Sequence, residues 1–178
     1  MKVAVLGRDG VINQLGTEAD WISQAQDWKA LPGSLEAIAK LNRGGYHVVI
    51  ATNQQGLARK ARNVEALHDI HDRMLRMIQE AGGTVDGIFF ATSGNKEGHG
   101  LNQPKAKLID QVRRRFSCRP QDMVIIGDSR ADIEAAAMLG IQAILLRTGK
   151  GSNTLKDLED FDGVTVYSNL ANAVDALV

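Results

Sequence analysis

A regular alternation of short β-branched runs with amphipathic segments constrains the fold of this chain most strongly. Buried-strand patterns, in which apolar residues run together between glycine or polar residues, lie at 2–6, 46–51, 85–90, 123–126, 141–146 and 164–167. Apolar residues at helical spacing lie between them, at 34–41, 63–81, 105–116, 131–139 and 170–177. Strands that alternate with helices form parallel β-α-β units. We therefore expect an α/β, Rossmann-like three-layer sandwich with a mainly parallel, doubly wound sheet.

The length and composition fit one globular domain. A chain of 178 residues can bury a core without disulfides. Its 44% hydrophobic and 24% charged residues argue against a disordered or fibrous chain. No linker, repeat or low-complexity segment divides it, so a single domain is expected over residues 1–178. Residues 8–32 have no sustained period and are predicted to form a flap, and no large cap domain is expected.

Charge and cysteine content restrict the partners and the compartment. Lysine plus arginine equals aspartate plus glutamate, at 21 each, so the net charge favours neither nucleic acid nor a membrane. The single cysteine, Cys118, excludes an internal disulfide framework and suits a reducing compartment. The apolar N-terminal stretch is too short for the core of a signal peptide, and no run approaches about 18 apolar residues. A cytoplasmic protein is expected.

Candidate functional residues follow the predicted strands. Ligands of an open parallel sheet collect at the carboxyl ends of the strands. The loops there read GRDGVIN at 7–13, TNQQG at 52–56, GDSRAD at 127–132 and RTGKG at 147–151. Each loop also has a purely structural interpretation: Asp9-Gly10 is a turn signal, and Asp128 and Asp132 can cap and decorate a helix start. Their joint occurrence at one edge of the sheet favours a common site.

The order of these motifs resembles the haloacid dehalogenase superfamily of phosphotransferases. Within it, the chain is similar to the D,D-heptose 1,7-bisphosphate phosphatases and the related histidinol-phosphate phosphatases. The resemblance covers nearly the whole chain and rests on RDGVIN (8–13), WKALPGSLEAIAKLN (28–42), ATNQQGLAR (51–59), GDSRAD (127–132) and TGKG (148–151). It implies a magnesium-dependent sugar-phosphate phosphomonoesterase that acts on a lipopolysaccharide precursor in the cytoplasm.

The resemblance also assigns roles to individual residues. In the family, the first carboxylate of an Asp-x-Asp motif attacks phosphorus and the second protonates the leaving oxygen. Asp9 matches the acid/base, Thr52 the phosphate-binding hydroxyl and Asp128 a magnesium ligand. The resemblance also implies that Asp9 contacts the magnesium ion and that Asp132 is a supporting acid. The implied ligand-binding residues are Arg8, Asn13, Thr52, Asn53, Gln54, Asn102 and Lys105.

The nucleophile position of that motif is Gly7. Glycine offers no attacking group, and it removes one of two side-chain ligands for a cation that prefers oxygen donors. Loss of a covalent nucleophile costs about 10⁶ in kcat in a well-studied serine protease. Asp9 is not expected to replace it, because successive side chains at a strand end point in opposite directions.

Residues 91–103 depart from the zinc loop that the resemblance implies. That loop has the form Cys-x-His, then Cys-x-Cys-Arg-Lys-Pro. Its four ligand positions hold Ala91, Ser93, His99 and Leu101. A structural zinc needs four ligands, so we expect none here.

Two further residues of that loop are replaced. Asn102 stands where the family has its substrate-phosphate arginine, and Gln103 where it has its motif lysine. Lys105 could swing toward the phosphate, although its place in the helical pattern favours a lysine on the helix surface.

Three functional hypotheses follow from these departures. The chain could be a non-catalytic relative that binds a phosphorylated ligand and binds magnesium weakly. It could be an active magnesium-dependent phosphatase with substituted catalytic groups, or an interaction or regulatory protein on the same scaffold. Retained Thr52, Asp128 and loop 148–151 favour residual anion binding. We expect no appreciable phosphatase activity, and expect repair to need Gly7→Asp with Gln103→Lys and Asn102→Arg.

Overall fold

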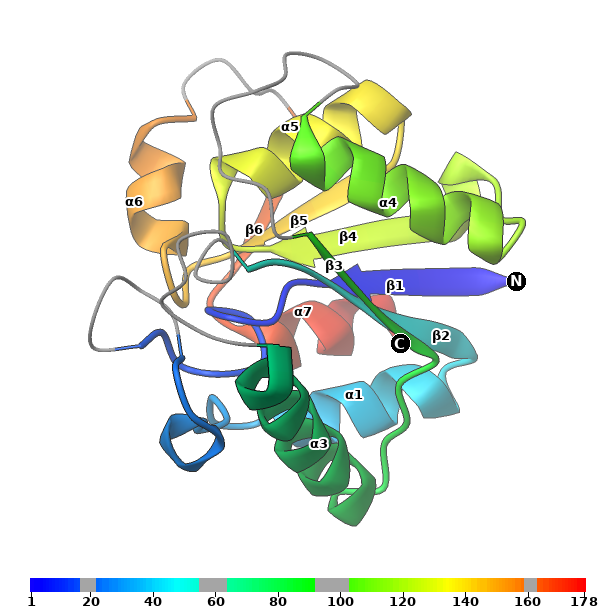
Figure 1. The fold of residues 1–178 in the computed structure, drawn as a ribbon. Coiled ribbons are helices and arrows are strands. Elements are labelled where there is room, and N and C mark those ends of the chain that lie inside the picture. Colours follow the sequence, from blue (N-terminus) through cyan, green and yellow to red (C-terminus); the bar gives the residue numbers. More distant parts are fainter. Residues whose placement is uncertain (17–21, 55–63, 92–102, 159–162) are drawn as a thin grey trace.

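The computed structural model describes residues 1–16, 22–54, 64–91, 103–158 and 163–178, and it is built around one parallel sheet (Figure 1). The strands are β1 (Lys2–Leu6), β2 (Tyr46–Asn53), β3 (Gly87–Ala91), β4 (Met123–Gly127), β5 (Gln142–Leu146) and β6 (Thr165–Tyr167). Their order is β3-β2-β1-β4-β5-β6, and every pair is parallel. The strand order changes direction between the neighbouring strands β1 and β4. Ligands of such sheets bind at this point, beyond the carboxyl ends of the strands.

Helices cover both faces of the sheet. They are α1 (Ser34–Arg43), α3 (Val64–Glu80), α4 (Pro104–Arg115), α5 (Arg130–Leu139), α6 (Gly151–Lys156) and α7 (Leu170–Leu177), with short 3₁₀ turns η1 (Ala25–Asp27) and η3 (Pro120–Asp122). Helices α1, α3 and α7 lie on one face, and α4 and α5 lie on the other (Figure 1). The expected α/β sandwich with a doubly wound parallel sheet is confirmed.

Alternate residues of β1 enter two separate hydrophobic cores. Ala4 and Leu6 lie in the core formed with α1, α3 and α7. Val3 and Val5 lie in the core formed with α4 and α5. Successive strand side chains point to opposite faces, and here both faces are covered. This burial explains why β1 reads as an unbroken apolar run.

The segment predicted as a flap is anchored to the domain where the structure describes it. Ile12 and Trp28 are fully buried in the core that contains α1 and α3. The backbone N–H of Leu31 donates to the carbonyl of Ile12 at 2.9 Å, and the N–H of Gln14 donates to the carbonyl of Lys29 at 2.9 Å. These contacts hold the loop after β1 against the core formed with α1, α3 and α7.

The short helix α6 was not expected from the sequence. Its first residue, Gly151, has no room for a side chain, because a Cβ would overlap the carbonyl oxygen of Leu146 in β5. Glycine here serves close packing and not a loop. Among the helices that the structure describes, none has the length and apolar character needed to cross a membrane.

Candidate functional site

Loops after four strands meet at the carboxyl edge of the sheet. Hydrogen bonds between them join Gln54 Nε2 to Asp9 Oδ2 (3.3 Å), Thr148 Oγ1 to the Gly10 carbonyl (2.7 Å) and the Lys150 N–H to Asp128 Oδ2 (2.9 Å). The expected common site is therefore assembled from the loops after β1, β2, β4 and β5.

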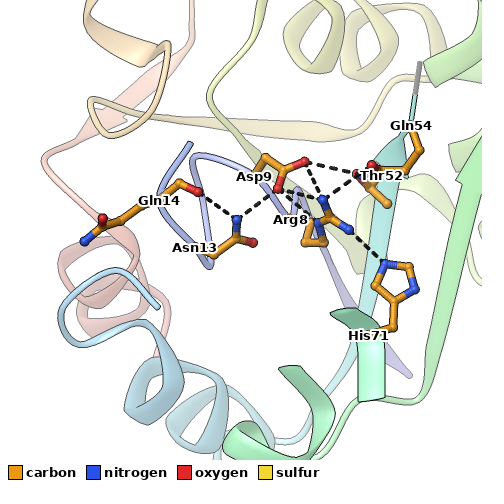
Figure 2. A network of polar contacts seen from close by, with 7 residues as sticks. All are labelled: Arg8, Asp9, Asn13, Gln14, Thr52, Gln54 and His71. Atoms are coloured by element: carbon orange, nitrogen blue, oxygen red, sulfur yellow. Dashed lines mark hydrogen bonds and ion pairs between the residues drawn. The ribbon is translucent and has the colours of Figure 1, made fainter. Parts of the chain in front are cut away.

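The carboxylate of Asp9 is held by three neighbouring side chains (Figure 2). Arg8 donates from Nη2 to both oxygens at 2.9 Å and from Nε to Oδ1 at 3.0 Å. Asn13 Nδ2 donates to Oδ1 at 2.9 Å, and Gln54 Nε2 donates to Oδ2 at 3.3 Å. Charge-assisted bonds of this kind are among the stronger ones in proteins. The protein therefore orients Asp9 before any ligand arrives.

Arg8 also links this loop to α3 through His71, a residue not expected at the site. Arg8 Nη1 lies 3.1 Å from His71 Nε2, and both side chains are buried. Because a guanidinium can only donate, Nε2 is the acceptor in this contact. The helical spacing of residues 63–81 gave no sign of this partner.

Thr52 keeps the position that the resemblance implies. It is buried near the end of β2, and its Oγ1 accepts a hydrogen bond from Gln54 Nε2 at 2.7 Å. An accepting hydroxyl can still donate its own proton. Thr52 can therefore donate to a ligand oxygen, while Asn53, also assigned to the ligand, forms the end of β2.

Lys105 lies within the site, so the prediction of a helix-surface lysine is wrong. Its Nζ lies 2.9 Å from Asp132 Oδ1 and donates to the carbonyl of Ala51 at 2.6 Å. Only 11% of its side chain is exposed. The physical reason is that α4 begins with Pro104 and packs its first turn against β2.

Gln103, at the position of the motif lysine, serves as the N-terminal cap of α4. Its side-chain oxygen accepts from the backbone N–H of Ala106 at 3.0 Å, and its Nε2 makes a longer contact of 3.5 Å with the carbonyl of Ala131. This bond satisfies one of the unpaired N–H groups at a helix start. The adjacent residue Asn102, which the resemblance assigns to the ligand, lies outside the described residues.

Asp132 is a structural acid that also faces Lys105. With Ser129 it forms a capping box at the start of α5, in which its Oδ2 accepts from Ser129 Oγ at 2.8 Å. Burial alone would raise the pKa of Asp132, but Lys105 and Ser129 outweigh this effect and lower it. Gly127 leaves the space for this carboxylate, since a Cβ there would overlap it.

Asp128 is the acid of the described site whose negative charge is least offset by neighbouring groups. Burial, together with the negative charge of Asp132, raises the pKa of its carboxyl from 3.8 to about 7. Its Oδ2 fits against Gly10 and Gly149, where any Cβ would overlap it. A cation or protonation would relieve this charge.

Gly7 directly follows β1 in a conformation that any residue can adopt. Its N–H donates to the carbonyl of Ile126 at 3.0 Å, and its φ is not positive. A Cβ at position 7 would lie 3.0 Å from Val11 Cγ2 and 3.9 Å from the backbone oxygen of Ile126. A small movement of Val11 would accommodate a side chain, so the backbone does not require glycine here.

The acids do not form a complete magnesium site. Over the described ranges, no three His, Cys, Asp or Glu side chains are grouped in a way that could hold a metal. Asp9 is held by Arg8, and Asp132 pairs with Lys105, which leaves Asp128 as the acid open to a cation. Magnesium prefers several oxygens in octahedral order, so a single unpaired carboxylate among the described residues could hold it only weakly. For zinc, Ala91 offers no ligand, and the other three implied positions lie outside the described residues.

Comparisons with known proteins identify the family. A family model described as HAD-hydrolase-like matches residues 101–173. The chain is 37% identical to the D-glycero-beta-D-manno-heptose-1,7-bisphosphate 7-phosphatase of Bordetella bronchiseptica, over 100% of this chain and 98% of the relative. It is 35% identical to the phosphatase of the same name from Pseudomonas aeruginosa, over 98% and 96% of the two chains.

Solved structures agree with this result. The crystal structure of the Bordetella bronchiseptica D,D-heptose 1,7-bisphosphate phosphatase, complexed with magnesium and phosphate, matches with a TM-score of 0.91 at 38% identity. The match covers 99% of this chain and 98% of that one. The Burkholderia thailandensis enzyme matches with a TM-score of 0.79 at 35% identity, over 99% and 98% of the chains. The chain therefore belongs to the heptose-1,7-bisphosphate 7-phosphatase family of the haloacid dehalogenase superfamily.

Proposed function

We propose that this chain binds a phosphorylated sugar at the carboxyl edge of the sheet without hydrolysing it. The observation that carries the proposal is Gly7, which leaves no carboxylate where the family motif places its nucleophile. A covalent phospho-enzyme cannot form on a hydrogen atom. Asp9 is oriented as an acid, but it has no attacking group to assist.

Retained polar groups support anion binding at this edge. The hydroxyl of Thr52 and the ammonium of Lys105 both lie at the carboxyl end of β2, since Lys105 binds the carbonyl of the preceding residue, Ala51. Arg8 balances the charge of Asp9, and Lys105 balances that of Asp132. These ion pairs leave Asp128 as the acid that would repel a phosphate, and its raised pKa weakens that repulsion near neutral pH.

The absent nucleophile also favours binding over turnover. An aspartate at position 7 would place a negative charge beside the phosphorus, and a cation would be needed to offset it. Glycine removes that charge, so a phosphate can bind with less dependence on magnesium. The proposal therefore includes weak magnesium binding and no zinc.

A cytoplasmic location belongs to the same proposal. Cys118 is buried in the core formed with α4 and α5, and burial raises the pKa of its thiol. A buried thiol of this kind is unreactive and serves packing. It suits a compartment in which disulfides are not used.

The test compares binding and turnover of D-glycero-D-manno-heptose 1,7-bisphosphate by three proteins. Calorimetry reports binding, and released phosphate reports hydrolysis. The wild type and Gly7→Ala should bind without release, and Gly7→Asp should release phosphate at a low rate, because position 102 still lacks the arginine that the resemblance implies. Gly7→Ala is the matched control, because it adds the Cβ without the carboxylate. Sustained release by the wild type, or no binding of heptose bisphosphate, would contradict the proposal.

A further inference from the structure

We infer that the ammonium of Lys105 is the phosphate-binding cation of this site, in place of the lysine that is missing at position 103. The inference rests on the proposed phosphate site and names one of its binding residues. It also changes the repair expected from the sequence, since Gln103→Lys should then be unnecessary.

The position of Nζ supports this role. It contacts β2 through the carbonyl of Ala51 at 2.6 Å and α5 through Asp132 Oδ1 at 2.9 Å. Thr52, the next residue of β2, carries the hydroxyl assigned to the phosphate. The cation and the hydroxyl therefore lie at the same strand end, at the carboxyl edge where ligands bind.

The hydrogen-bonding capacity of the ammonium agrees with a further partner. A lysine ammonium has three N–H donors and no acceptor. The carbonyl of Ala51 and the carboxylate of Asp132 use at most two of them. A buried cation gains from each further partner, and an anionic phosphoryl oxygen would provide a strong one.

Gln103 is committed to another task. Its side-chain oxygen caps the N–H of Ala106, and Pro104 follows as the first residue of α4. A lysine at position 103 would lose this cap, which typically costs about 1 kcal/mol. The sequence has thus separated two roles, with the cap at position 103 and the cation at position 105.

Binding of inorganic phosphate, measured by calorimetry, tests the inference first. Lys105→Met should weaken binding by about 10-fold or more, which corresponds to losing one hydrogen bond to a charged group. Lys107→Met is the matched control, because Lys107 lies exposed on the same helix, and it should bind as the wild type does. Lys105→Met with Gln103→Lys asks whether an ammonium from position 103 can restore affinity.

A purely structural role for Lys105 makes a different prediction. If it only neutralises Asp132, then Lys105→Met with Asp132→Asn should recover both stability and phosphate affinity. The inference predicts recovery of stability in urea without recovery of affinity. Recovery of both would overturn it, as would unchanged affinity in Lys105→Met.

Turnover in the Gly7→Asp background separates this inference from the proposed function. With p-nitrophenyl phosphate as substrate, Lys105→Met should lower kcat by about 100-fold, and Gln103→Lys should not raise it. If the wild type binds no phosphate, the proposed function fails, and this turnover series alone decides the role of Lys105. Absence of both phosphate binding and turnover by Gly7→Asp would overturn the inference, because a correctly placed cation should support one of the two.

Discussion

Glycines at this site differ in what they do, and the difference is visible in the space around each one. Gly127 cannot carry a side chain, because its Cβ would overlap the carboxylate of Asp132. Gly10 has a φ of +80° and lies against Asp128. Gly7 has neither restriction, since a Cβ there touches mainly Val11 at 3.0 Å. The missing carboxylate is thus a change in chemistry on a backbone that can still carry one.

This contrast predicts unequal effects of two alanine substitutions. Gly7→Ala should change the free energy of unfolding by less than about 1 kcal/mol, because Val11 can move by a few tenths of an ångström. Gly127→Ala should lower it by about 1–3 kcal/mol, the usual cost of overpacking. Urea unfolding of both variants checks this, and equal losses would contradict the account of the site.

The ion pair of Arg8 with Asp9 is predicted to matter for stability. Arg8 has no exposed side-chain surface, and Asp9 is 17% exposed. Arg8→Met leaves the carboxylate without its main partner and should cost about 3–5 kcal/mol. The exposed pair Lys40–Asp175 provides the control, and Lys40→Met should cost less than about 1 kcal/mol. Similar losses for the two variants in thermal or urea unfolding would show that the Arg8 network adds no stability.

At the scale of elements, periodicity predicted what depends on local pattern and missed what depends on distant partners. The β-branched runs predicted the strands, and the helical spacing predicted most helices. It could not show where Lys105 points, because that depends on the first turn of α4 meeting β2. Nor could it pair His71 with Arg8, which is 63 positions away in the chain. Helix α6 was missed because close packing at Gly151 looks like a loop signal in sequence.

The zinc motif that the resemblance implies at residues 91–101 gives a prediction at this scale. Ala91 ends β3 at the first implied zinc position and offers no ligand atom. Metal analysis of the purified protein should therefore find far less than one zinc per chain, and a chelator should leave the melting temperature unchanged. A structural zinc contributes more than about 10 kcal/mol to folding, so its removal would be evident. About one zinc per chain would disprove this interpretation of the loop.

The whole molecule has the family fold, with Gly7 at the position that the resemblance gives to the nucleophile. Its six-stranded sheet brings β1 and β4 together at the switch in strand order, and the site lies at their carboxyl ends. Most of the family fold was predictable from the motifs and from the alternation of strands with helices. The glycine at the position that the resemblance gives to the nucleophile was also visible, because Gly7 interrupts an otherwise matching motif. The pairing of Lys105 with Asp132 was not visible, since it depends on how α4 and α5 meet in space.

That charge pairing predicts phosphate binding with little dependence on magnesium. The affinity of the wild type for inorganic phosphate should change by less than about threefold between buffer with EDTA and buffer with magnesium, because no position-7 carboxylate needs to be offset. Gly7→Asp should bind phosphate more tightly with magnesium than without it. Strong magnesium dependence in the wild type would show that a fuller metal site forms than the one described.

Binding without hydrolysis is tested most directly by ³¹P NMR of heptose 1,7-bisphosphate mixed with the wild-type protein. The account predicts that both phosphate resonances change on binding and keep their full intensity over hours, with no free-phosphate signal. Gly7→Asp, under the same conditions, should convert the 7-phosphate to free phosphate. A growing free-phosphate signal with the wild type would contradict the account, as would resonances that the protein leaves unchanged.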